Sequence, residues 1–578
     1  DNTTASGTNS AAFGFKATAS GGDSTSIGKG SRATHQGSTA IGHDAHATAI
    51  RTTAVGTGSK ANAQCALAVG WKANATAVNA TAVGYTANAE GVNSTAIGTS
   101  AQATANYSSA YGTVANASGH ASIAFGANAN ANKTAAIALG VNSIASGANS
   151  STFGTESSAT AEDAIAFGHS AAASGIDAIA IGKSAVASEI NSTAIGTEAE
   201  ATAENSIAIG DSAKTSAANA TAVGTLAVAN QLSSSAYGTE AKATGNRSMA
   251  FGASSTANEQ NTIAIGTGAE ATGINSTAIG LDASVSGKNS IALGRKAITA
   301  GTNSTAVGSL AKAKGNQSIA IGRGASSDQF GATALGARSN ALGARSIAIG
   351  AYANATQACS MAIGLGAEST AANSIAIGDS ATTSADNATA VGTLAVANQL
   401  SSSAYGTEAA ATGERSMAFG AEAEANQENT TAMGTLAKAT GAYASSYGTN
   451  ATANSAAAMA FGSGAKATAQ VAMVFGTNST ATAENTIVIG TESSASQEDA
   501  IAVGYQAQAA GIDAIAFGKS SVANADDSIA VGSDAKASKT GAIALGDGEE
   551  ITLIVQRNSQ LIEKKFKLQF NDELNRYV

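Results

Sequence analysis

The sequence contains no proline, and aromatic residues (4%) and charged residues (12%) are scarce among its 578 positions. Most of its 44% hydrophobic share is alanine, so few large apolar side chains are available per residue. A compact globule with a thick core needs more of them, whereas a thin fold in which each layer touches only its neighbours does not. The composition therefore predicts a repetitive, elongated fold instead of several globular domains.

Basic stretches and long apolar runs are also missing. The formal charge is −10 and no stripe is rich in Lys and Arg, which argues against nucleic acid as a partner. No run of 18 or more apolar residues occurs, so we expect no direct insertion of this segment into a membrane. Residues 1–4 lack the charged and apolar regions of a signal peptide, and we expect none here.

Clusters that carry catalytic or metal chemistry are not apparent. Only His43 and His46 are close among the five histidines, and no cysteine or paired carboxylate joins them at metal-ligand spacing. The other histidines are His35, His120 and His169. Cys65 and Cys359 lie 294 residues apart, too far for a bridge within one repetitive chain. Without a Ser, His and Asp set or a phosphate-binding loop, we expect no enzyme, no cofactor and no metal.

Glycine returns every 14 residues from Gly14 to Gly546, 39 times without an insertion or a deletion. The residue before each of these motif glycines is bulky, the residue two before is alanine in 34 of the 39 copies, and Thr or Ile predominates three before. Alternation with a period of two is typical of a β-strand. The bulky residue and the Thr or Ile therefore share one face of the strand, and the alanine lies on the other.

Another small residue follows five positions after the motif glycine, as at Ala19, Ala33 and Ala47, and predicts a second short strand. Fourteen residues thus hold two strands and two tight corners, which make one coil of a parallel β-solenoid with about 39 coils. A glycine fits a corner that needs positive φ or a very close backbone approach. We expect structural corner glycines at Gly14, Gly28, Gly42, Gly56, Gly98, Gly196, Gly210, Gly280, Gly378 and Gly546. A helix of two heptads per repeat is disfavoured by these glycines and by the frequent Thr, Ser and Asn.

The two faces of the first strand differ in what they can pack. One coil offers its interior about two bulky side chains and a few alanines, so we place the bulky column inside. The alanine stripe then lies on the surface, where small side chains let neighbouring chains approach closely. We expect lateral association through this stripe, at Ala40, Ala96, Ala194, Ala208, Ala278 and Ala376.

The motif Asn-Ser-x-Ala-Ile-Gly followed by Ala-x-Ala resembles the YadA-like head of trimeric autotransporter adhesins. Close matches stand at residues 93–98, 191–196, 205–210, 275–280 and 373–378. The resemblance covers about residues 5–546 and implies a left-handed parallel β-roll, three chains around one axis and display on a surface. The expected fold class is therefore all-β, a homotrimeric rod of parallel β-solenoids, with the alanine stripe as the trimer interface.

The sequence also contains a repeat that is longer than one coil. The run from Asn205 to Phe251 recurs almost unchanged from Asn373 to Phe419, 168 residues or 12 coils later. Copying of whole blocks lengthens a spacer and multiplies surface patches, which suits a rod that extends reach.

The period stops after Gly546, so we expect one domain at residues 1–546 and a second segment at residues 547–578. Its candidate strands are residues 551–555 and 566–570, which flank a polar turn near residues 558–559. The segment either caps the open end of the solenoid and locks the trimer, or docks the rod to a base or a further subunit.

These features predict an extracellular adhesin at the cell surface that binds a host protein, a matrix protein or a glycan through many weak contacts. The alternative is a structural fibre, either on a virion surface with a base protein as partner or as a secreted filament. The ligand-binding residues are unknown. Some aromatic residues either contact a partner or cover small side chains on the solenoid wall: Trp71, Tyr85, Tyr352, Tyr443 and Tyr505.

Overall fold

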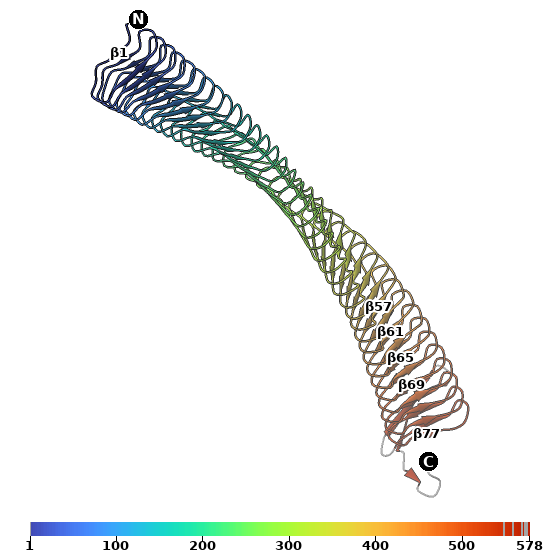
Figure 1. Cartoon of the computed structure of the whole chain (residues 1–578). Helices are drawn as coiled ribbons and strands as arrows, with labels where there is room; N and C mark the ends of the chain where they lie inside the picture. Colours follow the sequence, from blue (N-terminus) through green and yellow to red (C-terminus); the bar gives the residue numbers. More distant parts are fainter. Residues whose placement is uncertain (1, 547–549, 558–559, 568–569, 572–575, 578) are drawn as a thin grey trace. The chain divides into compact units, whose positions relative to one another are not determined.

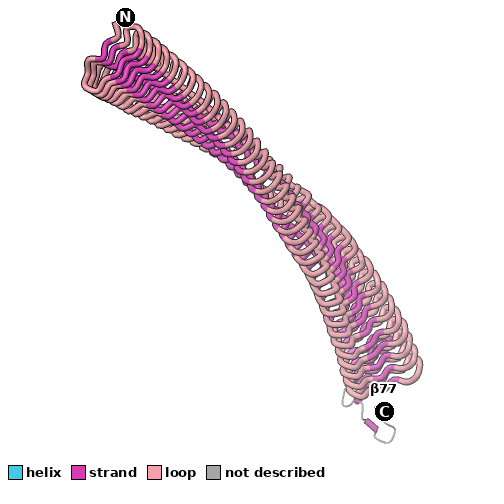
Figure 2. Tube along the Cα trace, in the orientation of Figure 1, coloured by secondary structure: helices cyan, strands magenta, loops and turns pink. Residues whose placement is uncertain are grey.

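The computed structural model describes residues 2–546, 550–557, 560–567, 570–571 and 576–577. Every regular element among these residues is a β-strand, and none is a helix (Figure 2). The chain divides into unit 1, residues 1–289, and unit 2, residues 290–578. The same 14-residue coil builds both units, which confirms the all-β parallel solenoid of about 39 coils.

Two strands of fixed length recur in every coil. The odd-numbered strands are two residues long and run from β1 (Thr4–Ala5) to β41 (Ser284–Val285) in unit 1 and from β43 (Ile298–Thr299) to β77 (Lys536–Ala537) in unit 2. The even-numbered strands are three residues long, end just before a motif glycine, and run from β2 (Ala11–Phe13) to β40 (Thr277–Ile279) and from β42 (Ile291–Leu293) to β78 (Ile543–Leu545). Within each series the bounds advance by 14 residues from one strand to the next. Figure 1 labels several odd-numbered strands, among them β57 (Val396–Ala397) and β61 (Glu424–Ala425), which follow one another along unit 2.

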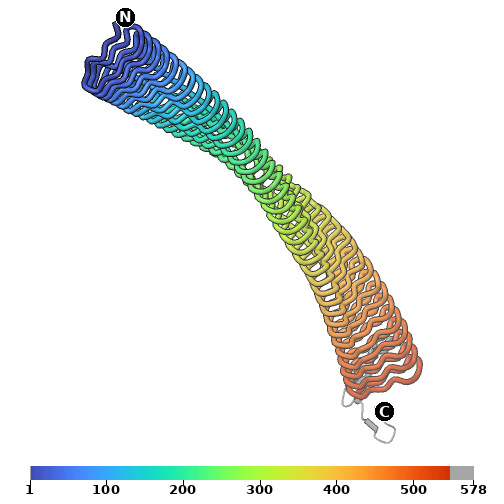
Figure 3. Tube along the Cα trace, viewed as in Figure 1, coloured from blue at the N-terminus to red at the C-terminus, as the bar shows by residue number. Residues whose placement is uncertain are grey.

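Neighbouring coils pair in parallel and with an offset of one repeat. Strand β14 (Thr95–Ile97) pairs residue for residue with β16 (Ser109–Tyr111), so each side chain lies beside its equivalent in the next coil. The corners pair as well, because the Thr86 amide donates to the Trp71 carbonyl at 2.8 Å. The gradual change of colour in Figure 3 shows that coils within each unit stack in the order of the sequence. Pairing of strands and corners satisfies the backbone polar groups that such short strands would otherwise leave open.

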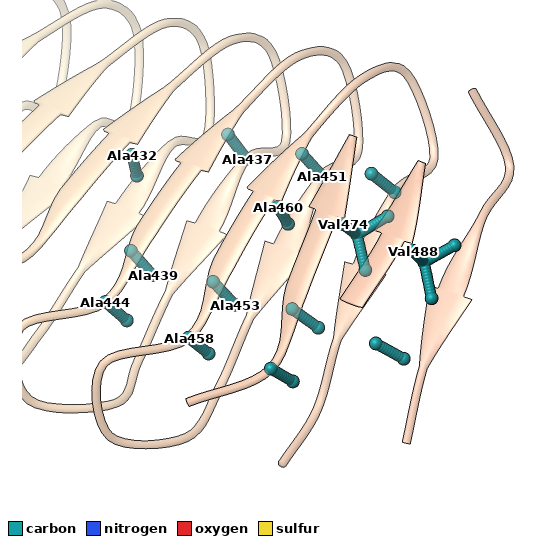
Figure 4. Packing of buried hydrophobic residues seen from close by; sticks show 14 of the residues in the cluster. Ala432, Ala437, Ala439, Ala444, Ala451, Ala453, Ala458, Ala460, Val474 and Val488 are labelled. Atoms are coloured by element: carbon teal, nitrogen blue, oxygen red, sulfur yellow. The ribbon is translucent and has the colours of Figure 1, made fainter. Parts of the chain in front are cut away.

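The interior of each coil is lined by small side chains. In the coil of residues 85–98 they are Ala87, Ala89, Ser94 and Ala96, all fully buried. Figure 4 shows the same packing in unit 2, where alanines from both strands point toward one another and Val474 and Val488 replace alanine near the end of the view. The largest fully buried side chains among the described residues are valines and threonines.

This packing corrects our assignment of the two faces. The alanines expected at the trimer interface lie inside the coil and have no exposed surface: Ala40, Ala96, Ala194, Ala208, Ala278 and Ala376. The bulky residue beside each of them points outward instead. The reason is volume, because two strands joined by tight corners enclose too little space for Ile or Phe without strain.

The motif glycines occupy corners that a side chain does not fit. At Gly210 φ is +134°, and a Cβ built there would lie 2.5 Å from the Gly224 carbonyl oxygen of the next coil. The φ angles of the motif glycines from Gly14 to Gly532 all lie between 106° and 158°. Gly546 shows the close approach alone, with a built Cβ 2.7 Å from the carbonyl carbon of Gly532. Strained φ and close backbone approach together require glycine at these corners.

The second corner of the coil explains the Asn-Ser pair of the motif. Asn191 has φ of +56°, the left-handed conformation that asparagine tolerates better than most residues. The Ser192 hydroxyl is buried and donates to the Glu189 carbonyl at 2.6 Å, which closes the turn. Ala194 then enters the interior and Ile195 faces outward. Each fixed residue of the Asn-Ser-x-Ala-Ile-Gly motif therefore has a structural role at one position of the coil.

After the repeat, the described strands pair in the antiparallel sense. Strand β79 (Glu550–Arg557) pairs with β80 (Gln560–Lys567), and β81 (Phe570–Asn571) pairs with β82 (Arg576–Tyr577). The first predicted strand lies inside β79. The second prediction, residues 566–570, was wrong in extent, because pairing resumes at Gln560 directly after the connection. The predicted turn near Asn558 and Ser559 lies outside the described residues, and the domain boundary at 546 stays a prediction.

Candidate functional site: the outer faces of the coil

The outer side of the even-numbered strands carries a bulky residue in every coil of both units. We call this surface the apolar face and define it as the first and third residues of the even-numbered strands from β2 to β78. The third residue is bulky in every coil, and the first is Thr or Ser in many coils and Ile or Met in most of the others. Ile97 is 38% exposed and Phe125 is 58% exposed on it, and Phe419 is 55% exposed in unit 2. Because the coils are in register, these side chains form a column with one bulky residue per coil. Contiguous exposed apolar surface of this kind marks an interaction site.

Sequence reasoning missed this face because it ranked side chains by hydrophobicity and not by volume. The sequence does contain a pattern that indicates the inner face: the alanine two before the motif glycine is replaced only by Ser, Thr or Val. A column on the surface would tolerate larger residues. Ser26, Thr152, Val474 and Val488 are such replacements, and all are buried.

Aromatic side chains stack along the apolar face from coil to coil. The ring centroids of Phe153 and Phe167 lie 4.8 Å apart with planes 9° from parallel. Tyr447 and Phe461 are stacked at 4.3 Å, and Phe475 continues that stack at 4.9 Å. These rings pack against one another, and their outer edges stay exposed. Exposed aromatic side chains of this kind often bind partners.

The duplicated blocks place the same aromatic pair on this face twice. Tyr237 and Phe251 have centroids 5.8 Å apart at 40°, and Tyr405 and Phe419 have centroids 5.5 Å apart at 38°. At the second copy, Tyr405, Phe419 and Met433 line an apolar depression. The duplication therefore repeats surface geometry as well as sequence.

Two of the predicted contact aromatics lie at the corner after the motif glycine. Trp71 and Tyr85 stack with centroids 4.4 Å apart, and the Lys72 ammonium lies 4.3 Å from the Trp71 ring centroid. Tyr85 is 51% exposed. Tyr352 lies at the same region of a coil in unit 2, with the Arg338 guanidinium 5.6 Å from its ring centroid. Tyr443 and Tyr505 are exposed too. The aromatics are thus accessible, although their role in binding stays a prediction.

Asparagines at the second corner form ladders on the outside of the coils. The amide of Asn79 donates to Asn93 at 2.9 Å. In another ladder, Asn261 donates to Asn275, and Asn275 donates to Asn289, each at 2.9 Å. Each ladder repeats one polar group at the spacing of the coils. The outer surface therefore carries columns of identical polar groups.

The ionisable residues singled out from sequence lie at the surface of the coils. The His43 Nε2 atom lies 3.6 Å from a carboxylate oxygen of Asp44. Burial lowers the pKa of His46, and the charge of Arg32 lowers it further. Across the described ranges, no three His, Cys, Asp or Glu side chains gather as a metal site. In that same part of the chain, no helix is long and apolar enough to cross a membrane.

The two cysteines are free thiols at equivalent positions of their coils. Cys65 is half-buried and Cys359 is exposed. Both stand at the second corner, with φ of +59° and +56°. They lie in different units, and both thiols are free, whereas the sequence separation predicted only that they do not pair within one chain.

The family model described as the YadA head domain repeat, in two copies per match, matches the chain repeatedly. The matched residues are 5–31, 33–59, 61–87, 89–115, 117–143, 138–160, 145–171, 159–185, 173–199, 201–227, 216–241, 243–269, 271–297, 300–325, 330–353, 355–381, 384–409, 411–437, 467–493, 495–521 and 523–548. A comparison with curated proteins gave no match.

These matches cover well over half of the sequence, and the coil geometry agrees with them. The chain belongs to the YadA head repeat family, the heads of trimeric autotransporter adhesins. This confirms the resemblance stated from the Asn-Ser-x-Ala-Ile-Gly motif. The trimeric state, the hand of the roll and the binding partner of this chain stay predictions.

Proposed function

We propose that three copies of this chain associate through the apolar face and that the trimer is an extracellular adhesin displayed on a cell surface. The observation that carries the proposal is the column of exposed bulky side chains, one per coil, on the outside of a coil whose interior is alanine. The proposal replaces the alanine stripe with the apolar face as the surface that joins the chains.

The energetics favour association through this face. Full burial of an Ile or Phe side chain contributes roughly 1.5–3 kcal/mol, and the apolar face offers such side chains in successive coils. Three flat apolar faces turned toward one axis remove these side chains from water together. The corners and the odd-numbered strands then remain outside, where the polar columns and exposed aromatics face a ligand.

Adhesion follows from repetition on this outer surface. The same polar and aromatic groups recur at the coil spacing and, through the duplicated blocks, at a spacing of 12 coils. Many weak contacts to a polymeric target raise the overall affinity without a deep pocket. We propose a host protein, a matrix protein or a glycan as the target class.

Sedimentation of purified protein tests the association. The wild-type chain is expected at three times its mass of 55.6 kDa. A triple substitution on the apolar face, Ile97→Lys, Ile195→Lys and Ile279→Lys, is expected to shift the population toward single chains, because three ammonium groups of each chain would have to be buried. A monomeric wild-type protein would refute the proposal.

A matched control removes three isoleucines that lie outside the apolar face. Ile144, Ile176 and Ile190 are each more than 40% exposed, on an odd-numbered strand or at the second corner. Their change to Lys is expected to leave the trimer intact. Dissociation of this control to the same extent would show that added charge, and not the apolar face, is responsible.

Attachment is tested separately with beads coated with wild-type trimer. They are expected to bind cultured cells or matrix more strongly than beads coated with the dissociated variant, because the trimer presents three copies of each column. Equal attachment by uncoated beads would contradict the adhesive function.

The runner-up is a structural fibre or filament. One observation favours it: the antiparallel pair β79 and β80 follows the last coil and presents strand edges, which recruit further strands. Electron microscopy separates the two functions, since end-to-end chains of particles support a filament and single particles support the adhesin.

A further inference from the structure

Positive charge is concentrated in one part of this acidic chain. Residues 290–367 contain seven Lys and Arg residues and one acidic residue, Asp328, a net charge of +6. The whole chain carries −10, so the remaining residues carry −16. The net charge of the whole sequence hides this segment, and the prediction that the chain has no basic stripe is wrong for it.

The coil brings four of these residues to one corner. Arg295 and Lys296 follow the motif glycine of one coil, and Arg323 and Arg338 stand at the same corner two and three coils later. The amide of Arg338 donates to the carbonyl of Arg323 at 2.8 Å, so these two corners are adjacent. At a coil spacing of about 4.8 Å, the four cations lie along a line of about 15 Å. We call these four residues the basic corner.

The charges of the basic corner are not paired within the described residues. All four residues are exposed, and among the described residues none forms an ion pair with a carboxylate. Arg338 instead donates to the Tyr352 hydroxyl at 3.4 Å. Elsewhere the chain pairs stacked charges across coils, as in Lys214 with Glu200 at 3.1 Å.

Arg323 and Arg338 stand at adjacent corners, where their like charges repel one another. Such an arrangement is stabilised when an external polyanion neutralises it. The guanidinium groups offer paired donors that match the oxygens of a sulfate or a phosphate.

The shape of the site selects among polyanions. The cations lie along one corner over three coil steps, with Ser309 and Leu310 at that corner in the coil between, and one line of cations matches one extended chain and not the two backbones of a duplex. Single-stranded nucleic acid binds through successive bases stacked on several open aromatic faces, and the corner positions from Arg295 to Tyr352 carry a single ring, that of Tyr352. A linear polysaccharide with sulfate groups requires no aromatic stacking for binding and needs only cations spaced along its length.

We infer that the basic corner binds a linear sulfated polysaccharide. The inference rests on the proposed function, because such polymers meet this surface only outside the cell, and it names one class of glycan for the adhesin. Binding is electrostatic, so it weakens as salt rises.

The test uses the whole protein and heparin as the sulfated probe, measured at salt concentrations between about 0.05 M and 0.2 M. The variant carries Arg295→Thr, Lys296→Ser, Arg323→Thr and Arg338→Ser. Thr and Ser already stand at these corner positions in other coils, for example Thr197 and Ser212, so the fold tolerates them. The matched control carries Lys16→Ser, Lys29→Thr, Lys183→Thr and Lys519→Thr, which removes the same charge from the same corner of distant coils.

The basic-corner variant is expected to bind heparin at least about tenfold more weakly, with a salt slope lower by about one for each charge removed. The control is expected to stay close to wild type. Equal loss in both variants, or no binding of heparin by wild type at the lowest salt, would overturn the inference. Tighter binding of single-stranded oligothymidylate than of heparin with the same number of charges would overturn it in favour of nucleic acid.

Bead attachment separates this inference from the proposed function. Enzymatic removal of sulfated polysaccharides from the cells is expected to reduce attachment of wild-type beads to the level of the basic-corner variant. Undiminished attachment after this treatment would refute the inference and leave the adhesive function standing.

Discussion

Ala96 and Ile97 are neighbours in β14, yet they lie on opposite sides of the sheet: Ala96 is fully buried and Ile97 is 38% exposed. The hydrophobic residue that most proteins bury is on the surface here, and the small residue fills the core. The same relationship recurs along both units. It determines which substitutions the coil accepts and which surface is left for other chains.

Enlarging an interior alanine should disrupt its own coil. Ala348 is fully buried between the equivalent residues of the neighbouring coils. The change Ala348→Phe is expected to destabilise the coil by about 1–3 kcal/mol or more, because the interior has no space for the ring. Hydrogen exchange of peptides that cover residues 334–362 reports the local loss of protection.

The control for this prediction is Ala348→Val, since Val474 and Val488 occupy the same interior position and are fully buried. It is expected to retain most of the protection. Equal tolerance of Phe and Val would mean that this column is not enclosed.

Replacing a motif glycine should be more harmful than replacing a glycine at the second corner. For Gly210→Ala the strained φ alone costs about 1–3 kcal/mol, and the new Cβ also collides with the carbonyl of Gly224. Gly37 has φ of +66°, and a Cβ there would lie 3.6 Å from Arg51 Cγ. Gly37→Asn is therefore expected to be tolerated, as Asn79 is at the same position with φ of +59°.

Thermal unfolding followed by circular dichroism compares the two glycine variants. A smaller loss of stability for Gly210→Ala than for Gly37→Asn would contradict the corner geometry described here.

Removing one whole coil should leave the remaining coils in register. Deletion of residues 127–140 joins Gly126 to Val141 in the same phase of the repeat. Deletion of residues 127–130 leaves ten residues, which cannot pass through both strands and both corners. The first deletion is expected to keep hydrogen-exchange protection on both sides of the junction, and the second to lose it locally.

A similar loss of protection in both deletions would show that the coils depend on specific neighbours and not on the 14-residue phase alone.

The protonation of His46 should follow its burial and its neighbours. Its ring lies in β7 (His46–Ala47) between Arg32 and Lys60 of the adjacent coils, and burial is the main reason that its pKa lies below 6.5. The unfolded chain has the ordinary pKa and binds more protons in this range. The contribution of His46 to stability is therefore fully present above pH 6.5 and is lost as pH falls through the lower, folded pKa.

Nuclear magnetic resonance of histidine labelled with carbon-13 measures this pKa, with His46→Gln to assign the signal. The double variant Arg32→Gln and Lys60→Gln is expected to raise the pKa of His46 without restoring it fully, since burial persists. A wild-type midpoint at or above 6.5 would refute the effect of burial.

Much of this architecture could be predicted from the sequence, because a glycine at every fourteenth position fixes the length of the coil, the offset of the strands and the place of one corner. Alternation in the residues before that glycine also shows that Ala96 and Ile97 lie on different faces. Alternation alone does not tell which face is inside. Which face is inside depends on the volume that two short strands enclose. The alanine column indicates that this volume is small, because none of its residues is larger than valine, as at Val474.

The surface sites were harder to predict for a different reason. Arg295, Arg323 and Arg338 are far apart in sequence and become a column only when the coil phase is known. Their role as a binding site also depends on the absence of ion pairs with carboxylates, which the net charge of the whole chain does not reveal. The strand that begins at Gln560 was misplaced because an antiparallel pair is set by its partner and not by its own alternation.

An electron cryomicroscopy map of the purified protein tests the central claim most directly. We predict a cross-section with three coils around one axis, in which Ile97, Phe125 and their equivalents point to that axis and the alanines fill the inside of each coil. A map with a single coil, or with the alanine column at the contact between chains, would contradict the account.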